Sequence, residues 1–278
     1  MKRQRGVALA IVVWFIAGMS LLVAGIVASA KVDTKTTQLY LARAKAVAAG
    51  DGAITLAMVE RRSGFDAAGG GPMVSESRQR LGDVEVLVRI IPAAGFVDVN
   101  NASPEMLQGL FHFAGGMDKG EAQMVAASVI KWRSGLADDT AGKRTRLRKE
   151  KGRFYSLEDM LRVDGVTRTL LDSIRDYAVA GSWTSGAMDW SSAPESMMNL
   201  LSEVNPGQAD AIGRRRASMA SAGSVGRLRG GGVYRADALV SYGGRTWLRR
   251  RWLKMESVRG SALPWQAVRT EAPRVVGG

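Results

Sequence analysis

An uncharged stretch near the start of the chain constrains the fold more than any other feature of the sequence. Lys2, Arg3 and Arg5 form a short basic leader, and the residues from Val7 to Ala30 carry no charged side chain. A helix rises about 1.5 Å per residue, so about 20 apolar residues span the hydrocarbon core of a bilayer. We therefore expect residues 7–30 to form one transmembrane helix. Because the basic residues precede the span, the N-terminus is expected in the cytoplasm and the body across the membrane.

The join between the basic leader and the apolar stretch distinguishes three interpretations of this segment. A cleaved secretory signal has an apolar stretch of roughly 7–15 residues, and this one is longer. An uncleaved anchor needs no special residue at the join. The join reads Arg5-Gly6-Val7, which resembles the type III signal of the pilin superfamily, cut by prepilin peptidase after the glycine. The resemblance implies that residues 1–6 are a leader peptide, and that the mature chain starts at Val7 and is methylated there.

Ile11 occupies the fifth position of this expected mature chain. Most members of the pilin superfamily carry glutamate there, whereas the K-type minor pseudopilins of type II secretion typically lack it. In pilin-like fibres that carboxylate is thought to meet the amino terminus of the subunit above, a neighbour that a tip subunit lacks. Burying an unpaired carboxylate in the bilayer costs several kcal/mol, so an apolar residue at this position suits a tip subunit.

The helical pattern continues beyond the membrane stretch and predicts one helix over residues 7–62. The segment 31–60 is rich in alanine, has apolar residues at helical spacing and contains no proline. Gly50 and Gly52 weaken this helix by about 1 kcal/mol each relative to alanine. A helix half in the membrane and half under a globular head is the plan of a pilin subunit. A free juxtamembrane stalk explains the length less well.

Alternating apolar residues predict a small antiparallel sheet built from two separate parts of the chain. Strand patterns appear before and after a long helical region, so residues 80–99 and 233–268 are expected to form the head. In the second part, Gly243-Gly244 separates two alternating segments, as in a β-hairpin. Residues 269–278 form the tail, which is expected to be disordered from Thr270 onward.

Residues 100–230 carry almost only helical signals and are expected to form an all-helical domain inserted between strands of the sheet. Ser103-Pro104-Glu105 combines a cap residue, a first-turn proline and an early acid. Ser156-Leu157-Glu158-Asp159 opens another helix in capping-box style. Residues 97–105 are echoed by residues 188–195, since each is a short extended piece that runs into a helix start.

The composition argues against an enzyme. The chain has no cysteine, which excludes disulfides, thiolate nucleophiles and cysteine-based zinc sites. The single histidine, His112, stands between two phenylalanines at an apolar helix end, where a packing role is expected rather than catalysis. The net charge of +13 permits binding to nucleic acid, anionic lipid or an acidic partner and does not choose among them.

Several short stretches together resemble the general secretion pathway protein K family across nearly the whole chain. They are RQRGVAL at 3–9, ARAKA at 42–46, VDVNNAS at 97–103, KWR at 131–133, GRF at 152–154, LEDML at 157–161, VDGV at 163–166 and SAP at 192–194. The resemblance implies an α+β fold of pilin-like type. A long N-terminal transmembrane helix would pack on a small antiparallel sheet, and a large all-helical domain would be inserted into it.

The same resemblance implies a non-enzymatic role at the tip of the type II secretion pseudopilus, where the subunit starts assembly for export across the outer membrane. The expected partners are the I-, J- and H-type minor pseudopilins, the major pseudopilin, prepilin peptidase and the inner-membrane assembly platform. The expected location is the bacterial inner membrane, as a single-pass protein with a periplasmic body.

One departure from the family concerns calcium. Members often carry an acidic calcium-binding segment after the Trp-Arg pair, and calcium prefers about six to eight oxygen ligands. Here Asp138 and Asp139 are the only carboxylates before the strongly basic run 143–151, which would repel the ion. No cofactor is therefore firmly expected, and calcium at these two aspartates is poorly supported.

The alternative interpretation is a membrane-anchored DNA-binding protein of the competence type. Val163-Asp164-Gly165-Val166 resembles a helix-hairpin-helix turn, whose backbone N–H groups can hold a phosphate at a helix N-terminus. Gly165 and Arg168 would make that contact, and the basic runs would add affinity. We favour the simpler interpretation, in which the hairpin joins two packed helices, because a competence-type receptor needs neither the strands nor a peptidase site at Gly6.

Overall fold

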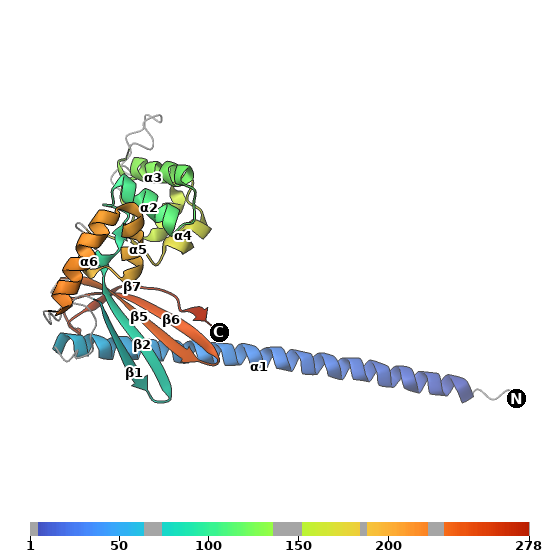
Figure 1. Ribbon diagram of the computed structural model, residues 1–278. Helices are drawn as coiled ribbons and strands as arrows, with labels where there is room; N and C mark the ends of the chain where they lie inside the picture. The colour runs from blue at the N-terminus through green and yellow to red at the C-terminus, as the bar shows by residue number, and fades with distance from the viewer. Residues whose placement is uncertain (1–4, 64–73, 136–151, 184–187, 222–230, 278) are drawn as a thin grey trace.

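The protein is described from a computed structural model that covers residues 5–63, 74–135, 152–183, 188–221 and 231–277. Its dominant element is the helix α1 (Arg5–Ser63), which is 59 residues long. The N-terminal half of α1 projects away from the body, and the C-terminal half lies under a sheet that carries the other helices (Figure 1). The single long helix predicted from residue 7 to residue 62 is confirmed.

A six-stranded antiparallel sheet packs on the C-terminal half of α1. Its strands are β1 (Ser75–Leu81), β2 (Val84–Pro92), β5 (Val233–Tyr242), β6 (Arg245–Lys254), β7 (Gln266–Thr270) and β8 (Arg274–Gly277). The order is β1-β2-β5-β6-β7, and β8 also pairs with β6. The predicted hairpin is present, since β5 and β6 pair from Tyr242↔Arg245 onward and Gly243 and Gly244 both have positive φ in the turn.

The insertion is confirmed by strand order, because β2 and β5 are neighbours while the chain between them forms a separate layer above the sheet (Figure 1). Its helices are α2 (Pro104–Phe113), α3 (Lys119–Arg133), α4 (Arg168–Ile174), α5 (Glu195–Val204) and α6 (Pro206–Ser221), with 3₁₀ turns η1 (Ala93–Gly95), η4 (Leu157–Arg162) and η5 (Trp190–Ser192). Two short strands, β3 (Val97–Asp98) and β4 (Ala178–Val179), pair in parallel within it. The fold is therefore α+β, as predicted, but the insertion is not all-helical because it contains this strand pair.

The structure differs from the sequence-based expectation at the edges of the sheet. β1 was not predicted, because its sequence SESRQRL is polar and lacks an apolar alternation. Residues 97–98 pair with β4 inside the insertion and do not join the main sheet. The tail is ordered as β8, where Trp247↔Val275 and Leu248↔Arg274 extend the ladder along β6. The expected disorder from residue 270 is therefore wrong.

Two apolar cores hold the three layers together. The lower core joins small residues of α1, such as Ala46 and Ala53, to alternate residues of β2 and β5. The upper core fills the insertion and includes Trp252 from the opposite face of β6. Gly50 of α1 lies so close to β6 that an added Cβ would stand 2.8 Å from Arg249 Cβ. Glycine and alanine thus let the helix approach the sheet closely.

Candidate functional site: the apolar helix and its carrier

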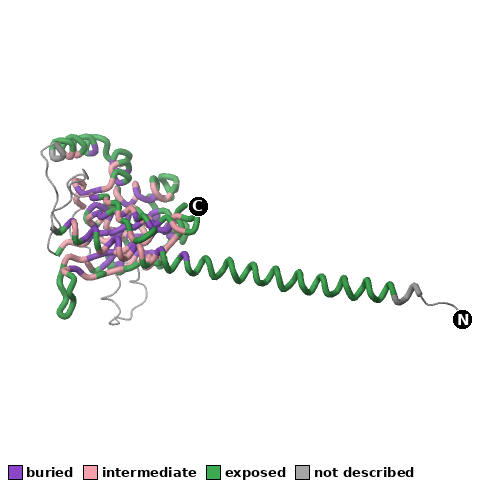
Figure 2. The backbone as a smooth tube through the Cα atoms, turned by 90° about the horizontal axis from the view of Figure 1, so that it is seen from below, coloured by how far each residue is buried: buried purple, intermediate pink, exposed green. Residues whose placement is uncertain are grey.

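The N-terminal half of α1 is an exposed apolar surface. Every residue from Leu9 to Leu41 is exposed, and Ala42 is the first buried one (Figure 2). The most apolar window of the helix has a mean hydropathy of 2.5, and none of it is buried. So large a continuous apolar patch is rare on soluble proteins and typical of a surface that contacts a bilayer or another protein. The helix is long and apolar enough to cross a membrane.

Hydroxyl groups in this half donate to carbonyls of the same helix. Ser20 Oγ donates to the carbonyl of Ile16 at 2.8 Å, and Thr34 Oγ1 donates to the carbonyl of Ala30 at 2.8 Å. A segment in hydrocarbon must satisfy its polar groups internally, and the Ser20 bond meets this need inside the expected span. This geometry is compatible with the predicted span over residues 7–30.

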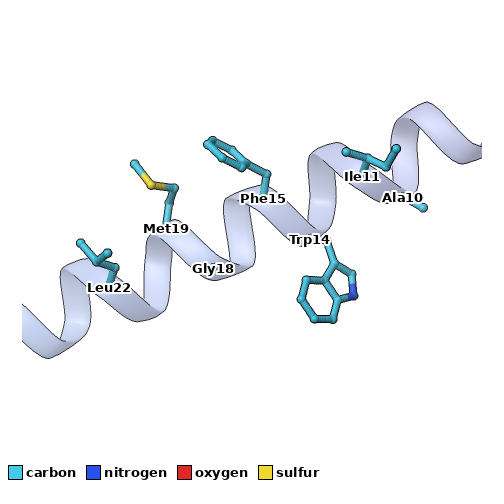
Figure 3. A pocket seen from close by; sticks show the side chains of 7 residues that line it. All are labelled: Ala10, Ile11, Trp14, Phe15, Gly18, Met19 and Leu22. Atoms are coloured by element: carbon cyan, nitrogen blue, oxygen red, sulfur yellow. The ribbon is translucent and has the colours of Figure 1, made fainter.

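Ile11 lies on this surface with 64% of its area exposed. Figure 3 shows Ile11, Phe15, Met19 and Leu22 pointing to one side of the helix, while Trp14 points to the opposite side. A Cβ at Gly18 would meet no atom within 4 Å, so this face is open to a neighbour. No acidic side chain lies in the first turn of α1.

The expected cleavage point, Gly6 and Val7, lies at the beginning of α1, one residue after its start at Arg5. The leader residues 1–4 lie outside the described residues. Cleavage after Gly6 therefore stays a prediction.

Three family-like stretches that are far apart in sequence meet inside the insertion. Asn100 Nδ2 donates to the carbonyl of Phe154 at 3.0 Å, and the Phe154 amide donates to Asn100 Oδ1 at 2.8 Å. Arg133 donates to the carbonyls of Val99 (3.2 Å) and Ala102 (2.8 Å). Burial lowers the pKa of Arg133, against the field of Asp98. These motif residues therefore hold distant segments of the insertion together through hydrogen bonds.

The turn 163–166, which the alternative interpretation assigns to DNA contact, packs inside the insertion. A Cβ on Gly165 would lie 2.8 Å from Val125 Cγ2, so this turn is pressed against α3. At the start of α4, Thr167 Oγ1 accepts from the Leu170 amide at 3.2 Å, and Arg168 pairs with Asp172 at 3.5 Å. The turn thus has a packing role between η4 and α4, and the DNA-binding alternative is not supported.

In the described parts of the chain, no group of three His, Asp or Glu side chains is placed to hold a metal ion. Asp138 and Asp139 lie outside the described residues. His112 Nδ1 stands 2.6 Å from the Met117 carbonyl, a contact within one helix end.

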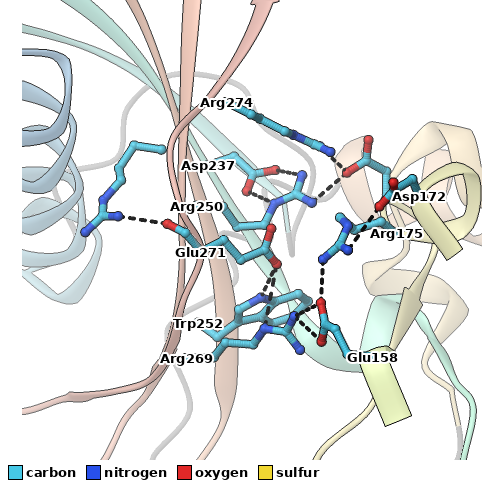
Figure 4. A network of polar contacts seen from close by, with 11 residues as sticks. Glu158, Asp172, Arg175, Asp237, Arg250, Trp252, Arg269, Glu271 and Arg274 are labelled. Carbon is cyan, nitrogen blue, oxygen red and sulfur yellow. Dashed lines mark hydrogen bonds and ion pairs between the residues drawn. The ribbon is translucent and has the colours of Figure 1, made fainter. Parts of the chain in front are cut away.

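A chain of ion pairs joins the insertion to the sheet, and sequence reasoning did not find it (Figure 4). Arg250 of β6 holds Asp237 of β5 through two hydrogen bonds of 2.7 and 2.9 Å and reaches Asp176, after α4, at 2.6 Å. Asp176 also accepts from Arg274 at 2.8 Å. A second cluster lies beside it, where Glu158 of η4 accepts from Arg175 at 2.9 Å and from Arg269 of β7 at 3.0 Å.

The electrostatics of this interface follow from burial and pairing. Burial lowers the pKa of Arg235 to about 10, and the nearby charge of Arg250 acts in the same direction. Burial opposes the charge of Arg250 as well, but Asp237 and Asp176 outweigh it and raise its pKa. Desolvation disfavours ionisation of Asp176, yet Arg250 and Arg274 hold its pKa below the usual value. These ion pairs connect the insertion to β6, β7 and β8 of the sheet.

Comparison with known proteins gives few matches. No protein-family model matches the chain, and no curated protein matches it significantly. Among solved structures, the chain is similar to one chain of the GspK–GspI–GspJ complex of the enterotoxigenic Escherichia coli type 2 secretion system. The sequences are 10% identical, the TM-score is 0.47, and the alignment covers 88% of this chain and 100% of that chain.

Proposed function

We propose that this chain is a non-enzymatic minor pseudopilin of a type II secretion system that caps the tip of the pseudopilus and initiates its assembly. The observation that carries the proposal is the division of α1. Its N-terminal half is exposed from Leu9 to Leu41 and uncharged as far as Ala30, and its C-terminal half packs on the sheet from Ala42 onward. A helix divided in this way can rest in the inner membrane and later pack among the helices of other subunits.

The tip position is supported by the bulk and placement of the insertion. It forms a layer over the sheet face away from α1, at the end of the molecule remote from the free N-terminal half (Figure 1). A subunit entering above would meet this layer. The absence of an acid at Ile11 agrees with a subunit that has no neighbour above it.

In this proposal the work of the protein is assembly and needs no cofactor. The exposed apolar face of α1 would pack against the helices of I- and J-type minor pseudopilins, then H-type and major pseudopilins. Burial of apolar area contributes about 25 cal/mol per Å² to such contacts. Prepilin peptidase and the assembly platform would act on the chain in the inner membrane, with the body in the periplasm.

The test is the N-terminal mass of the full chain, expressed with and without prepilin peptidase, beside the variant Gly6→Val. We expect residues 1–6 to be removed only when the peptidase is present, and the substitution to block removal. A leader that stays intact with active peptidase would refute the proposal. Cleavage of Gly6→Val at the same rate would show that the join is not the recognised site.

A further inference from the structure

A groove runs along the seam between the insertion and the last strands of the sheet. It has a volume of about 810 Å³, within the range of protein ligand sites. One wall is η4 and α4, with Tyr155, Glu158 and Arg168. The other wall is the chain from Val268 to Arg274, in β7 and at the start of β8. The proposed assembly role of α1 makes no use of this groove.

The groove is bordered by the edge of the sheet at β7, not by a face of the sheet. Three consecutive residues of β7, Val268 to Thr270, line it with Glu271 and Ala272 just after the strand, whereas a strand that turned one face to a groove would contribute only alternate residues. β7 is the last strand in the sheet order, and no strand in the described ranges pairs with its outer side. The groove therefore has a free strand edge as one wall.

The register identifies which backbone groups this edge offers. The Glu271 amide donates to the Arg250 carbonyl at 3.1 Å, so Glu271 points its amide toward β6. Thr270 is the Cα partner of Arg251 in the preceding pair of the ladder. Because successive residues of an antiparallel strand alternate, the N–H and C=O of Thr270 point away from β6, toward the groove.

The side chains of the groove carry an excess of positive charge. Four arginines line it, at positions 168, 175, 269 and 274, with three carboxylates, at 158, 172 and 271. Asp172 is shared by Arg168 (3.5 Å) and Arg175 (3.1 Å). The side chain of Arg168 is 65% exposed, which leaves most of its guanidinium open to another anion.

We propose that this groove binds an extended segment of a partner protein, which adds a strand to β7 and places a carboxylate against Arg168. The free N–H and C=O of Thr270 match the backbone of a strand, which neither a lipid headgroup nor a nucleic acid provides. The exposed ring of Tyr155 gives a contact for a side chain of the segment. Strand addition supplies affinity, and the arginine selects for the acid.

The test measures binding of fluorescent eight-residue peptides to the full chain in detergent micelles. The peptides alternate threonine and valine and carry one central Glu or Lys, each with a free or an amidated C-terminus. We expect the Glu peptide to bind about tenfold tighter than the Lys peptide. Binding of the free-terminus forms alone would identify a chain end as the carboxylate, and binding of the amidated Glu form would identify an acidic side chain.

Variants separate the backbone contact from the charge contact. Thr270→Pro removes the outward N–H, which makes no bond to β6, and should weaken binding about tenfold, whereas Thr270→Val keeps the N–H and should bind as wild type. Arg168→Glu should abolish the preference for Glu over Lys. Arg162→Glu is the matched control, since its side chain is 69% exposed and pairs with Asp159 at 3.8 Å. Equal binding by the two Thr270 variants, or equal effects at Arg162 and Arg168, would overturn the proposal. The arginine comparison decides if Thr270→Pro does not fold.

Discussion

Asp237 is the residue whose loss should cost the most stability at the interface between sheet and insertion. Its carboxylate is bound by Arg250 at 2.7 and 2.9 Å and stands 3.1 Å from Arg235 Nε. The side chains of Asp237, Arg250 and Arg235 are only 9%, 3% and 7% exposed. Asp237→Ala would leave two buried guanidinium groups facing each other without the carboxylate. Breaking a buried pair in this way costs about 3–5 kcal/mol.

The structure also predicts an asymmetry between the partners of this pair. Arg250→Met leaves Asp237 beside Arg235, and it leaves the half-exposed Asp176 paired with Arg274. No anion or cation is then left buried alone, so Arg250→Met should cost clearly less than Asp237→Ala. The exposed pair Lys45–Asp83, with side chains 43% and 73% exposed, provides the control, and Asp83→Ala should have little effect on stability.

The assay is urea unfolding of the full chain in detergent, followed by tryptophan emission, because Trp252 is buried beside this cluster. With a slope of about 2–3 kcal/mol per molar urea, Asp237→Ala should lower the midpoint by about 1–2.5 M. Arg250→Met should give a smaller shift, and Asp83→Ala less than about 0.5 M. If Asp237→Ala behaves like Asp83→Ala, or if Arg250→Met costs more than Asp237→Ala, the assignment of Asp237 as the shared buried anion is wrong.

Three further predictions concern the helix and the interface. Gly50→Leu should lower stability by about 1–3 kcal/mol in the same urea assay, because its side chain would overlap Arg249, whereas Gly18→Leu has open space and should not. The carboxyls of Asp176 and Glu158 have lowered pKa values in the folded protein, so their stabilisation is complete above their unfolded pKa values, near pH 4, and is lost as the pH falls through the lower folded values. The urea midpoint should therefore fall in that acid range, and the double variant Asp176→Asn/Glu158→Gln should show a smaller fall. Ile11→Glu should reduce co-purification with the other minor pseudopilins while Ile11→Leu does not, and unchanged co-purification would refute the packing argument for Ile11.

The elements that the sequence predicts correctly are those with a local signal. α1 follows from an uninterrupted helical pattern, and the β5–β6 hairpin follows from Gly243-Gly244 between alternating segments. The echoed helix starts are also local. Asp98 Oδ1 accepts from the Asn100 amide at 3.0 Å, and Asp189 Oδ1 accepts from the Ser191 amide at 3.0 Å, before α2 and α5 respectively. Because each of these hydrogen bonds joins residues two positions apart, the turn can be predicted from the local sequence alone.

The interface was not predictable because its partners are distant in sequence and its residue types are ambiguous. The arginines at 249–251 contribute to a net charge that alone permits many partners. In β6 they alternate in direction, so Arg249 holds Asp51 of α1 at 2.9 Å, across 198 residues, while Arg250 faces the insertion. The strand period of two predicts opposite faces for neighbouring arginines. Nothing local identifies Asp51 and Asp176 as their partners.

The placement of the family-like motifs bears on where function resides in this fold. Asn100, Arg133 and Phe154 carry much of the sequence resemblance, and the structure uses them to fasten the insertion internally. Residues with internal partners are not available to another molecule without breaking those contacts. The surfaces that remain open, the apolar half of α1 and the edge of β7, have ordinary residue types, such as Phe15 and Thr270, and carry no recognisable motif. In this chain the motif residues therefore stabilise the insertion. Recognition of a partner is expected at the open surfaces, through their shape and backbone groups rather than through a sequence motif.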